Sequence, residues 1–84
     1  MRDIQAEIRA ILARHARLGA DPATIAADAD LYAAGMTSRS SVNVMLALED
    51  AFEVEFPDQM LRRDVFQSIT AIASYVETLF AARG

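Results

Sequence analysis

Hydrophobic residues recur at helical spacing in three stretches of the chain, over about residues 3–18, 38–52 and 69–80. Apolar residues that return every three or four positions lie along one side of an α-helix. In the first and last helices the residues expected to face inward are Ile4, Ile8, Ile11, Leu12, His15, Leu18, Ile69, Ile72, Val76, Leu79 and Phe80. Only Val54 and Phe56 alternate with acids as in a strand, and Pro57 ends that short pattern. The pattern therefore predicts an all-α fold.

Polar residues and glycines mark where these helices begin and end. Gly19 is expected to close the first helix, since glycine favours the turn after a helix C-terminus. Thr37 or Ser38 is expected to cap the second helix and Ser68 the last, because a side-chain hydroxyl accepts a hydrogen bond from a free backbone N–H. Asp58 would cap a short additional helix. The expected architecture is one small four-helix domain, 1–84, with a short third helix.

The loop between the first two helices is long for so small a domain and runs from Gly19 to about Ala34. A loop of this length must be held by its own apolar residues. The candidates are Ile25, Leu31 and Tyr32.

The second helix has apolar residues on two faces. One face is expected to enter the core and contains Ser41, Val44, Met45, Leu48 and Phe52. A second face lies roughly 130° away and mixes apolar with charged residues: Arg39, Val42, Leu46, Glu49 and Glu53. This second face indicates either a docking surface for a partner or ordinary apolar residues at the surface.

Ser38 lies between these two faces, at the N-terminus of the second helix. Free backbone N–H groups and the helix dipole favour an anion at this position, so a phosphodiester on the hydroxyl would be well placed. The residues alone leave open that Ser38 only caps the helix.

Composition excludes several kinds of chemistry. The chain has 84 residues, 54% of them hydrophobic, with no cysteine and no lysine. A disulfide framework, a thiolate metal site, a cysteine nucleophile and a lysine Schiff base are therefore excluded. The one histidine, His15, has no nucleophile or carboxylate partner beside it in the sequence and is expected to be structural. The chain has no Gly-rich phosphate loop and no metal-spaced ligands, so we expect no enzyme and no metal site. No signal peptide or membrane-length apolar run is visible, so we expect a cytoplasmic protein.

Charge is unevenly distributed along the chain. The net charge is −4, with +2 in residues 1–20, −7 in residues 21–58 and +1 in residues 59–84. The acidic middle contains Ser38 and its helix, which argues against a nucleic-acid partner and favours basic protein partners. A solvated acidic surface without a specific partner is the simpler alternative.

The stretch around Ser38 resembles the acyl carrier protein family. The family pattern is an apolar turn, a glycine, two residues and then a serine, which Gly35 and Ser38 reproduce. The helix that follows is also similar, and the resemblance spans roughly residues 4–80. Fatty-acid members usually have Asp before the serine and Leu after it, whereas this chain has Thr37 and Arg39.

The resemblance implies a 4′-phosphopantetheine arm on Ser38, attached by a phosphopantetheinyl transferase. The cargo would be a thioester-linked amino acid or acyl group, presented to partner enzymes by a monomeric carrier without catalysis of its own. Four segments are similar to those of bacterial aminoacyl carriers loaded by amino acid:carrier protein ligases that resemble seryl-tRNA synthetases: residues 30–32, 36–38, 55–58 and 66–69. Two alternatives remain, namely a fatty-acid or polyketide carrier and an unmodified helical protein-interaction module.

Overall fold

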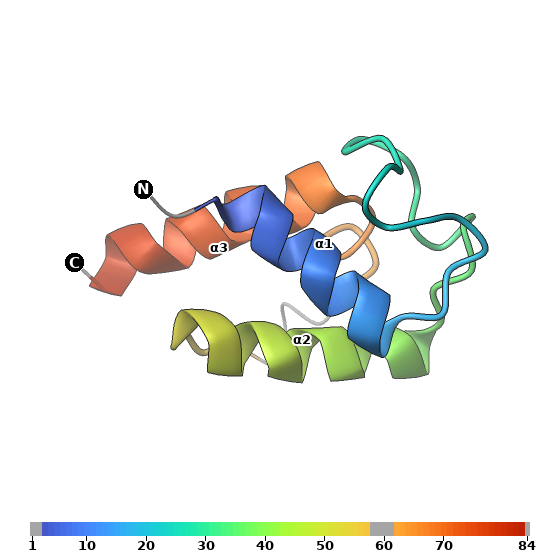
Figure 1. Ribbon diagram of the computed structural model, residues 1–84. Helices are drawn as coiled ribbons and strands as arrows, with labels where there is room; N and C mark the ends of the chain where they lie inside the picture. Colours follow the sequence, from blue (N-terminus) through green and yellow to red (C-terminus); the bar gives the residue numbers. More distant parts are fainter. Residues whose placement is uncertain (1–2, 58–61, 84) are drawn as a thin grey trace.

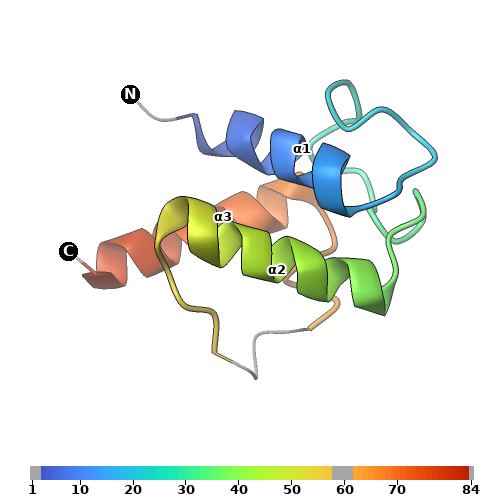
Figure 2. The ribbon, with the colours of Figure 1, turned by 60° about the horizontal axis from the view of Figure 1, so that its bottom comes forward.

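Three helices make up the secondary structure of residues 3–57 and 62–83, which are the residues that the computed structural model describes. They are α1 (Ile4–His15), α2 (Ser38–Phe52) and α3 (Ile69–Arg83), and no strand occurs in those two ranges. Figures 1 and 2 show α2 and α3 running in the same general direction and α1 running against them. Helix α1 packs on both other helices. The all-α class is confirmed, whereas the short helix expected after Asp58 falls outside the described residues.

Short polar side chains begin each helix, as the sequence predicts for α2 and α3, while the cap of α1 was not predicted. The Asp3 carboxylate accepts a hydrogen bond from the Ala6 N–H at 3.1 Å. The Ser68 hydroxyl accepts one from the Ala71 N–H at 3.0 Å. Each bond satisfies a backbone donor that has no partner inside the helix.

The C-terminal end of α1 differs from the prediction. The helix stops at His15, and Ala16 is already extended, with φ −118° and ψ 124°. Gly19 does not close the helix but donates its N–H to the Ala34 carbonyl in the long loop, at 2.7 Å. His15 is exposed, because Ala16 occupies the next inward position and is buried. The placement of His15 on the apolar face was therefore wrong.

The hydrophobic core lies between the three helices and is closed by the loops. Nine residues expected to share one core are all fully buried: Ile8, Leu12, Leu31, Val44, Leu48, Phe52, Phe66, Ile72 and Val76. The connector after α2 contributes Val54 and Phe56, which are buried while the acids beside them are exposed. The ring of Phe56 lies 5.8 Å from that of Phe66 and 5.2 Å from that of Tyr75, between centroids.

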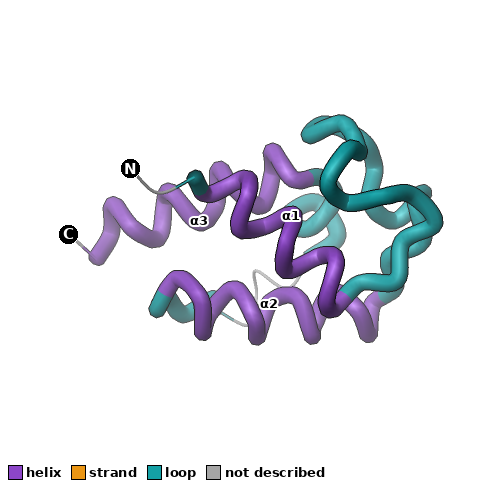
Figure 3. The backbone as a smooth tube through the Cα atoms, in the orientation of Figure 1, coloured by secondary structure: helices purple, strands orange, loops and turns teal. Residues whose placement is uncertain are grey.

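The long loop between α1 and α2 is tied to α1 and to the start of α3, and it forms one end of the molecule (Figure 3). The Arg9 guanidinium of α1 donates to the carbonyls of Pro22 and Ile25, at 2.9 and 2.6 Å. The Leu31 N–H donates to the Gln67 carbonyl, just before α3, at 2.7 Å. Leu31 is buried and Ile25 is half-buried, so the expected apolar contacts of the loop are confirmed.

None of the helices in the described ranges is long and apolar enough to cross a membrane.

Candidate functional site at the start of helix α2

A glycine turn places the start of α2 against the bundle. Gly35 has φ +124°, a backbone conformation that residues with a side chain rarely adopt. A methyl group at this position would also lie 3.3 Å from the Arg17 carbonyl oxygen. Directly after the turn, Met36 is buried and donates its N–H to the Leu31 carbonyl at 3.0 Å. The residues that follow are therefore held in a defined position.

Thr37 is the residue that caps α2, which decides between the two predicted candidates. Its backbone is extended, with φ −111° and ψ 171°. Its Oγ1 accepts a hydrogen bond from the Ser40 N–H at 3.1 Å and lies 2.9 Å from the Ser40 hydroxyl. Ser38 is thus the first residue of the helix, and its hydroxyl is not needed as a cap.

Four hydroxyl side chains cluster at this helix start, and only one of them is exposed and free. The hydroxyls of Thr37 and Ser40 are paired with each other. Ser41 is 4% exposed and donates its hydroxyl to the Ser38 carbonyl at 2.8 Å. The Ser38 side chain is exposed, and within the described residues its hydroxyl makes no hydrogen bond. An enzyme that modifies a hydroxyl here can therefore reach Ser38 most readily.

A cavity of about 240 Å³ lies beside Ser38. Its lining residues are Tyr32, Ser38, Ser41, Val42, Arg62 and Arg63. The Arg63 guanidinium carbon lies 4.5 Å from the centroid of the Tyr32 ring, in cation–π contact. Among the described residues, no carboxylate lines this cavity. The acidic surroundings expected for Ser38 from its neighbours in the sequence are therefore not what it meets on this side.

The two arginines differ in how far their charge is already neutralised. Arg62 donates to both carboxylate oxygens of Asp64, at 3.0 and 2.6 Å. That hydrogen bond raises the pKa of Arg62 above its ordinary value and lowers the pKa of Asp64 below its own. Among the described residues, Arg63 forms no ion pair.

The predicted docking face divides into two parts. Arg39 and Leu46 are exposed, and Leu46, at 54%, is the most exposed large hydrophobic residue of the described ranges. Val42 is half-buried at the edge of the cavity beside Ser38. Glu49 is half-buried, and its carboxylate accepts the Phe56 N–H at 2.8 Å. Glu53 lies past the helix end, with φ 54°. The two acids are thus at the C-terminal end of α2, where Glu49 holds the connector.

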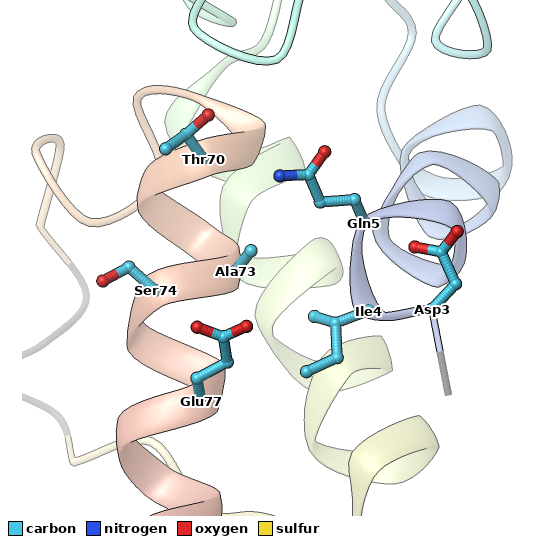
Figure 4. A pocket seen from close by; sticks show the side chains of 7 residues that line it. All are labelled: Asp3, Ile4, Gln5, Thr70, Ala73, Ser74 and Glu77. Atoms are coloured by element: carbon cyan, nitrogen blue, oxygen red, sulfur yellow. The ribbon is translucent and has the colours of Figure 1, made fainter. Parts of the chain in front are cut away.

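Two other hollows lie away from Ser38. A groove of about 450 Å³ between α1 and α2 includes Leu46, His15 and Asp50 in its lining. A larger groove, of about 530 Å³, lies between α1 and α3, where Ile4 and Gln5 face Ala73 and Glu77 (Figure 4). In the described ranges no group of three or more His, Cys, Asp or Glu side chains could hold a metal ion.

The comparison with protein families decides what kind of site this is. A family model described as a phosphopantetheine attachment site matches residues 6–76. The chain belongs to this family. It is a carrier protein with 4′-phosphopantetheine as its prosthetic group and without catalysis of its own, as predicted. The exposed, unpaired hydroxyl at the start of α2 fits a group that is attached through a phosphodiester.

Relatives of this carrier protein agree with the family in sequence and in structure. It is 49% identical over 76 residues to an aminoacyl carrier protein of Agrobacterium fabrum, which covers 90% of this chain and 92% of the relative. A carrier protein from Agrobacterium tumefaciens, solved with an engineered Bradyrhizobium japonicum glycine:[carrier protein] ligase and ATP, is 49% identical. The match has a TM-score of 0.85 and covers 90% of this chain and 99% of that one. A solution structure of an A. tumefaciens protein is 47% identical, with a TM-score of 0.74 and coverage of 94% and 95%.

Two features of the site were not predicted from the sequence. One is the approach of Arg62 and Arg63 to Ser38, which lies more than twenty positions earlier in the chain. The other is the hydrogen bond from the Phe56 N–H to Glu49. Neither had a periodic or motif signal, since both depend on how the connector folds back.

Proposed function

We propose that Ser38 carries the 4′-phosphopantetheine arm and that the arm holds an amino acid as a thioester. The observation that supports Ser38 most directly is its hydroxyl, which is exposed and unpaired while those of Thr37, Ser40 and Ser41 are engaged. The aminoacyl cargo is supported by the A. fabrum aminoacyl carrier protein, which is 49% identical over nine-tenths of this chain. The partners would be a phosphopantetheinyl transferase and an amino acid:carrier protein ligase.

The cavity beside Ser38 is a poor site for a long alkyl chain. Burying an alkyl chain gains about 0.8 kcal/mol per CH₂ only where the surroundings are apolar. Here Arg62 and Arg63 line the cavity, and covering them would remove charged groups from water. The fatty-acid or polyketide carrier is therefore the second candidate.

The docking surface for the loading enzyme would be centred on Leu46, with Val42 and Arg39 toward the serine. Leu46 is an exposed apolar side chain that a partner can bury, and Arg39 would select a partner with an acid at the matching position. Glu49 and Glu53 would form the rim of the surface. The carrier would act as a single monomeric domain, 1–84, in the cytoplasm.

Mass spectrometry of two serine variants tests the attachment site. The wild-type chain, Ser38→Ala and the matched control Ser40→Ala are incubated with coenzyme A and a phosphopantetheinyl transferase. We expect wild type and Ser40→Ala to gain one phosphopantetheine and Ser38→Ala to gain none, with a free energy of unfolding changed by no more than about 0.5 kcal/mol. A mass gain on Ser38→Ala would contradict the assignment, and no gain on any chain would favour the interaction module.

Loading assays then test the cargo. The wild-type protein, with the phosphopantetheine arm attached, is offered amino acids with a glycine:carrier protein ligase and ATP. In a parallel assay it is offered fatty acids with an acyl-loading enzyme. We expect an aminoacyl adduct that hydroxylamine removes, as it does for thioesters. An acyl adduct formed in preference to the aminoacyl one would move the assignment to the second candidate.

A further inference from the structure

We propose that Arg63, held against the ring of Tyr32, is the counter-ion of the phosphodiester on Ser38. This inference rests on the proposed function, because it needs the arm to be attached at Ser38. It concerns where the phosphodiester, the charged group nearest the protein, lies. It also assigns a positioning role to a residue far in sequence from Gly35 and Ser38.

The cavity brings Ser38 and Arg63 together. Ser38 and Arg63 line the same hollow of about 240 Å³, so a group attached to the serine hydroxyl begins its path beside the guanidinium. The guanidinium carbon of Arg63 lies 4.5 Å from the Tyr32 ring centroid. A guanidinium held over a ring keeps the N–H donors at its edge available, and those donors match the oxygens of a phosphate. Tyr32 thus holds the donor in place before the anion arrives.

Of the two arginines that line the cavity, Arg63 is the one available to an anion. Arg62, the other cation that lines the cavity, is already paired with Asp64. Arg63 forms no ion pair within the described residues, and the first turn of α2 contains no acid that would attract it. The N–H groups of Ser38 and Arg39 have no acceptor in the described part of the chain and would support the same anion.

The same arrangement has a consequence for the far end of the arm. An aminoacyl thioester ends in an ammonium group, and the described lining of the cavity offers no carboxylate to bind it. The cavity therefore favours the phosphodiester at the root of the arm and disfavours the cargo. The arm is held where it joins the protein, while the loaded end stays in solvent and remains accessible to the next enzyme.

Phosphorus NMR on the loaded protein tests this pairing without an activity measurement. Attachment of the phosphopantetheine arm to wild type, Arg63→Gln and Arg14→Gln is first verified by mass. The control Arg14→Gln loses the same charge from the groove between α1 and α2, away from this cavity. We expect the phosphodiester resonance of wild type and Arg14→Gln to shift as salt rises from 0.05 to 1 M, because salt screens an exposed pair. In Arg63→Gln the low-salt resonance should already lie at the high-salt position, and the salt dependence should be lost.

The proton resonances of Tyr32 and Arg63 and the melting temperature give an independent test of the pairing. Arm attachment should shift the Tyr32 ring and Arg63 side-chain resonances, and it should raise the Tm of wild type more than that of Arg63→Gln. Tyr32→Leu, which removes the ring face, should lose part of the salt dependence. If Ser38 is loaded and Arg63→Gln behaves as Arg14→Gln does in both measurements, the pairing is refuted while the proposed function stands. If Ser38 accepts no arm, both proposals fail together.

Discussion

Leu46 and Leu48 test whether one side of α2 binds the partner enzyme while the other side packs in the core. The two side chains are chemically identical and two positions apart, yet Leu46 is 54% exposed and Leu48 is fully buried. Fully burying a leucine is worth about 1.5–3 kcal/mol, so covering the exposed 54% of Leu46 in a complex would contribute about 0.8–1.6 kcal/mol. Leu46→Ala should therefore lower kcat/KM for loading roughly 4- to 15-fold.

The matched variant should show the opposite pattern. Leu48→Ala opens a cavity in the core and should lower the free energy of unfolding by about 2–5 kcal/mol. Leu46→Ala should change it by no more than about 0.5 kcal/mol. The assays are urea unfolding and steady-state loading by a ligase that accepts the wild-type chain. Wild-type loading kinetics of Leu46→Ala would refute the docking role, and unfolding of Leu46→Ala at the urea concentration that unfolds Leu48→Ala would place Leu46 in the core.

Three further predictions concern other parts of the chain. Phe52→Ala should lower the free energy of unfolding by about 3–5 kcal/mol, because this buried ring packs edge-on against Phe80 at 5.7 Å; urea unfolding measures it, and a loss below 1 kcal/mol would contradict the packing. Gly35→Ala should lower that free energy by about 1–3 kcal/mol through backbone strain at φ +124°, visible as a lower Tm, whereas an unchanged Tm would contradict the left-handed turn. Arg39→Glu should slow loading roughly 2- to 5-fold at low salt and less at high salt, with an unchanged Tm; equal loading at low salt would remove Arg39 from the docking surface.

The core was predictable because its signal is periodic. Leucine, isoleucine, valine and phenylalanine at helical spacing have one low-energy arrangement in a small bundle, with their side chains turned inward. The nine residues expected to share one core are fully buried, whereas His15, also expected to face inward, is exposed. The start of α2 was predictable for a related reason, since few residue types satisfy the free N–H groups at a helix N-terminus and Thr37 is one of them.

The end of α1 was not predictable, because nothing local stops the helix there. Ala16, Arg17 and Leu18 would all continue a helix by intrinsic preference. The helix ends because the chain turns to meet the long loop, where Gly19 bonds to Ala34. Long-range packing decided this boundary.

The surroundings of Ser38 were predictable only in part. Its position at a helix start came from the glycine and hydroxyl pattern, which is local. The arginines that line the cavity come from a segment that folds back after α2, and a charge profile along the sequence assigned the serine to an acidic region. Charge counted along a chain and charge gathered in space are different quantities in a domain where segments distant in sequence line the site.

The hydrogen bond from Leu31 to Gln67 has a consequence for building hybrid carriers. Surface loops usually tolerate exchange and insertion, because few of their backbone groups are committed to the rest of the fold. This loop is bonded to the segment before α3 through Leu31, and Thr70 at the start of α3 donates its N–H back to the Ala27 carbonyl at 2.9 Å. The unit to transplant is therefore the loop together with the start of α3. A graft that moves the loop alone would have to form both bonds with a host segment of different sequence.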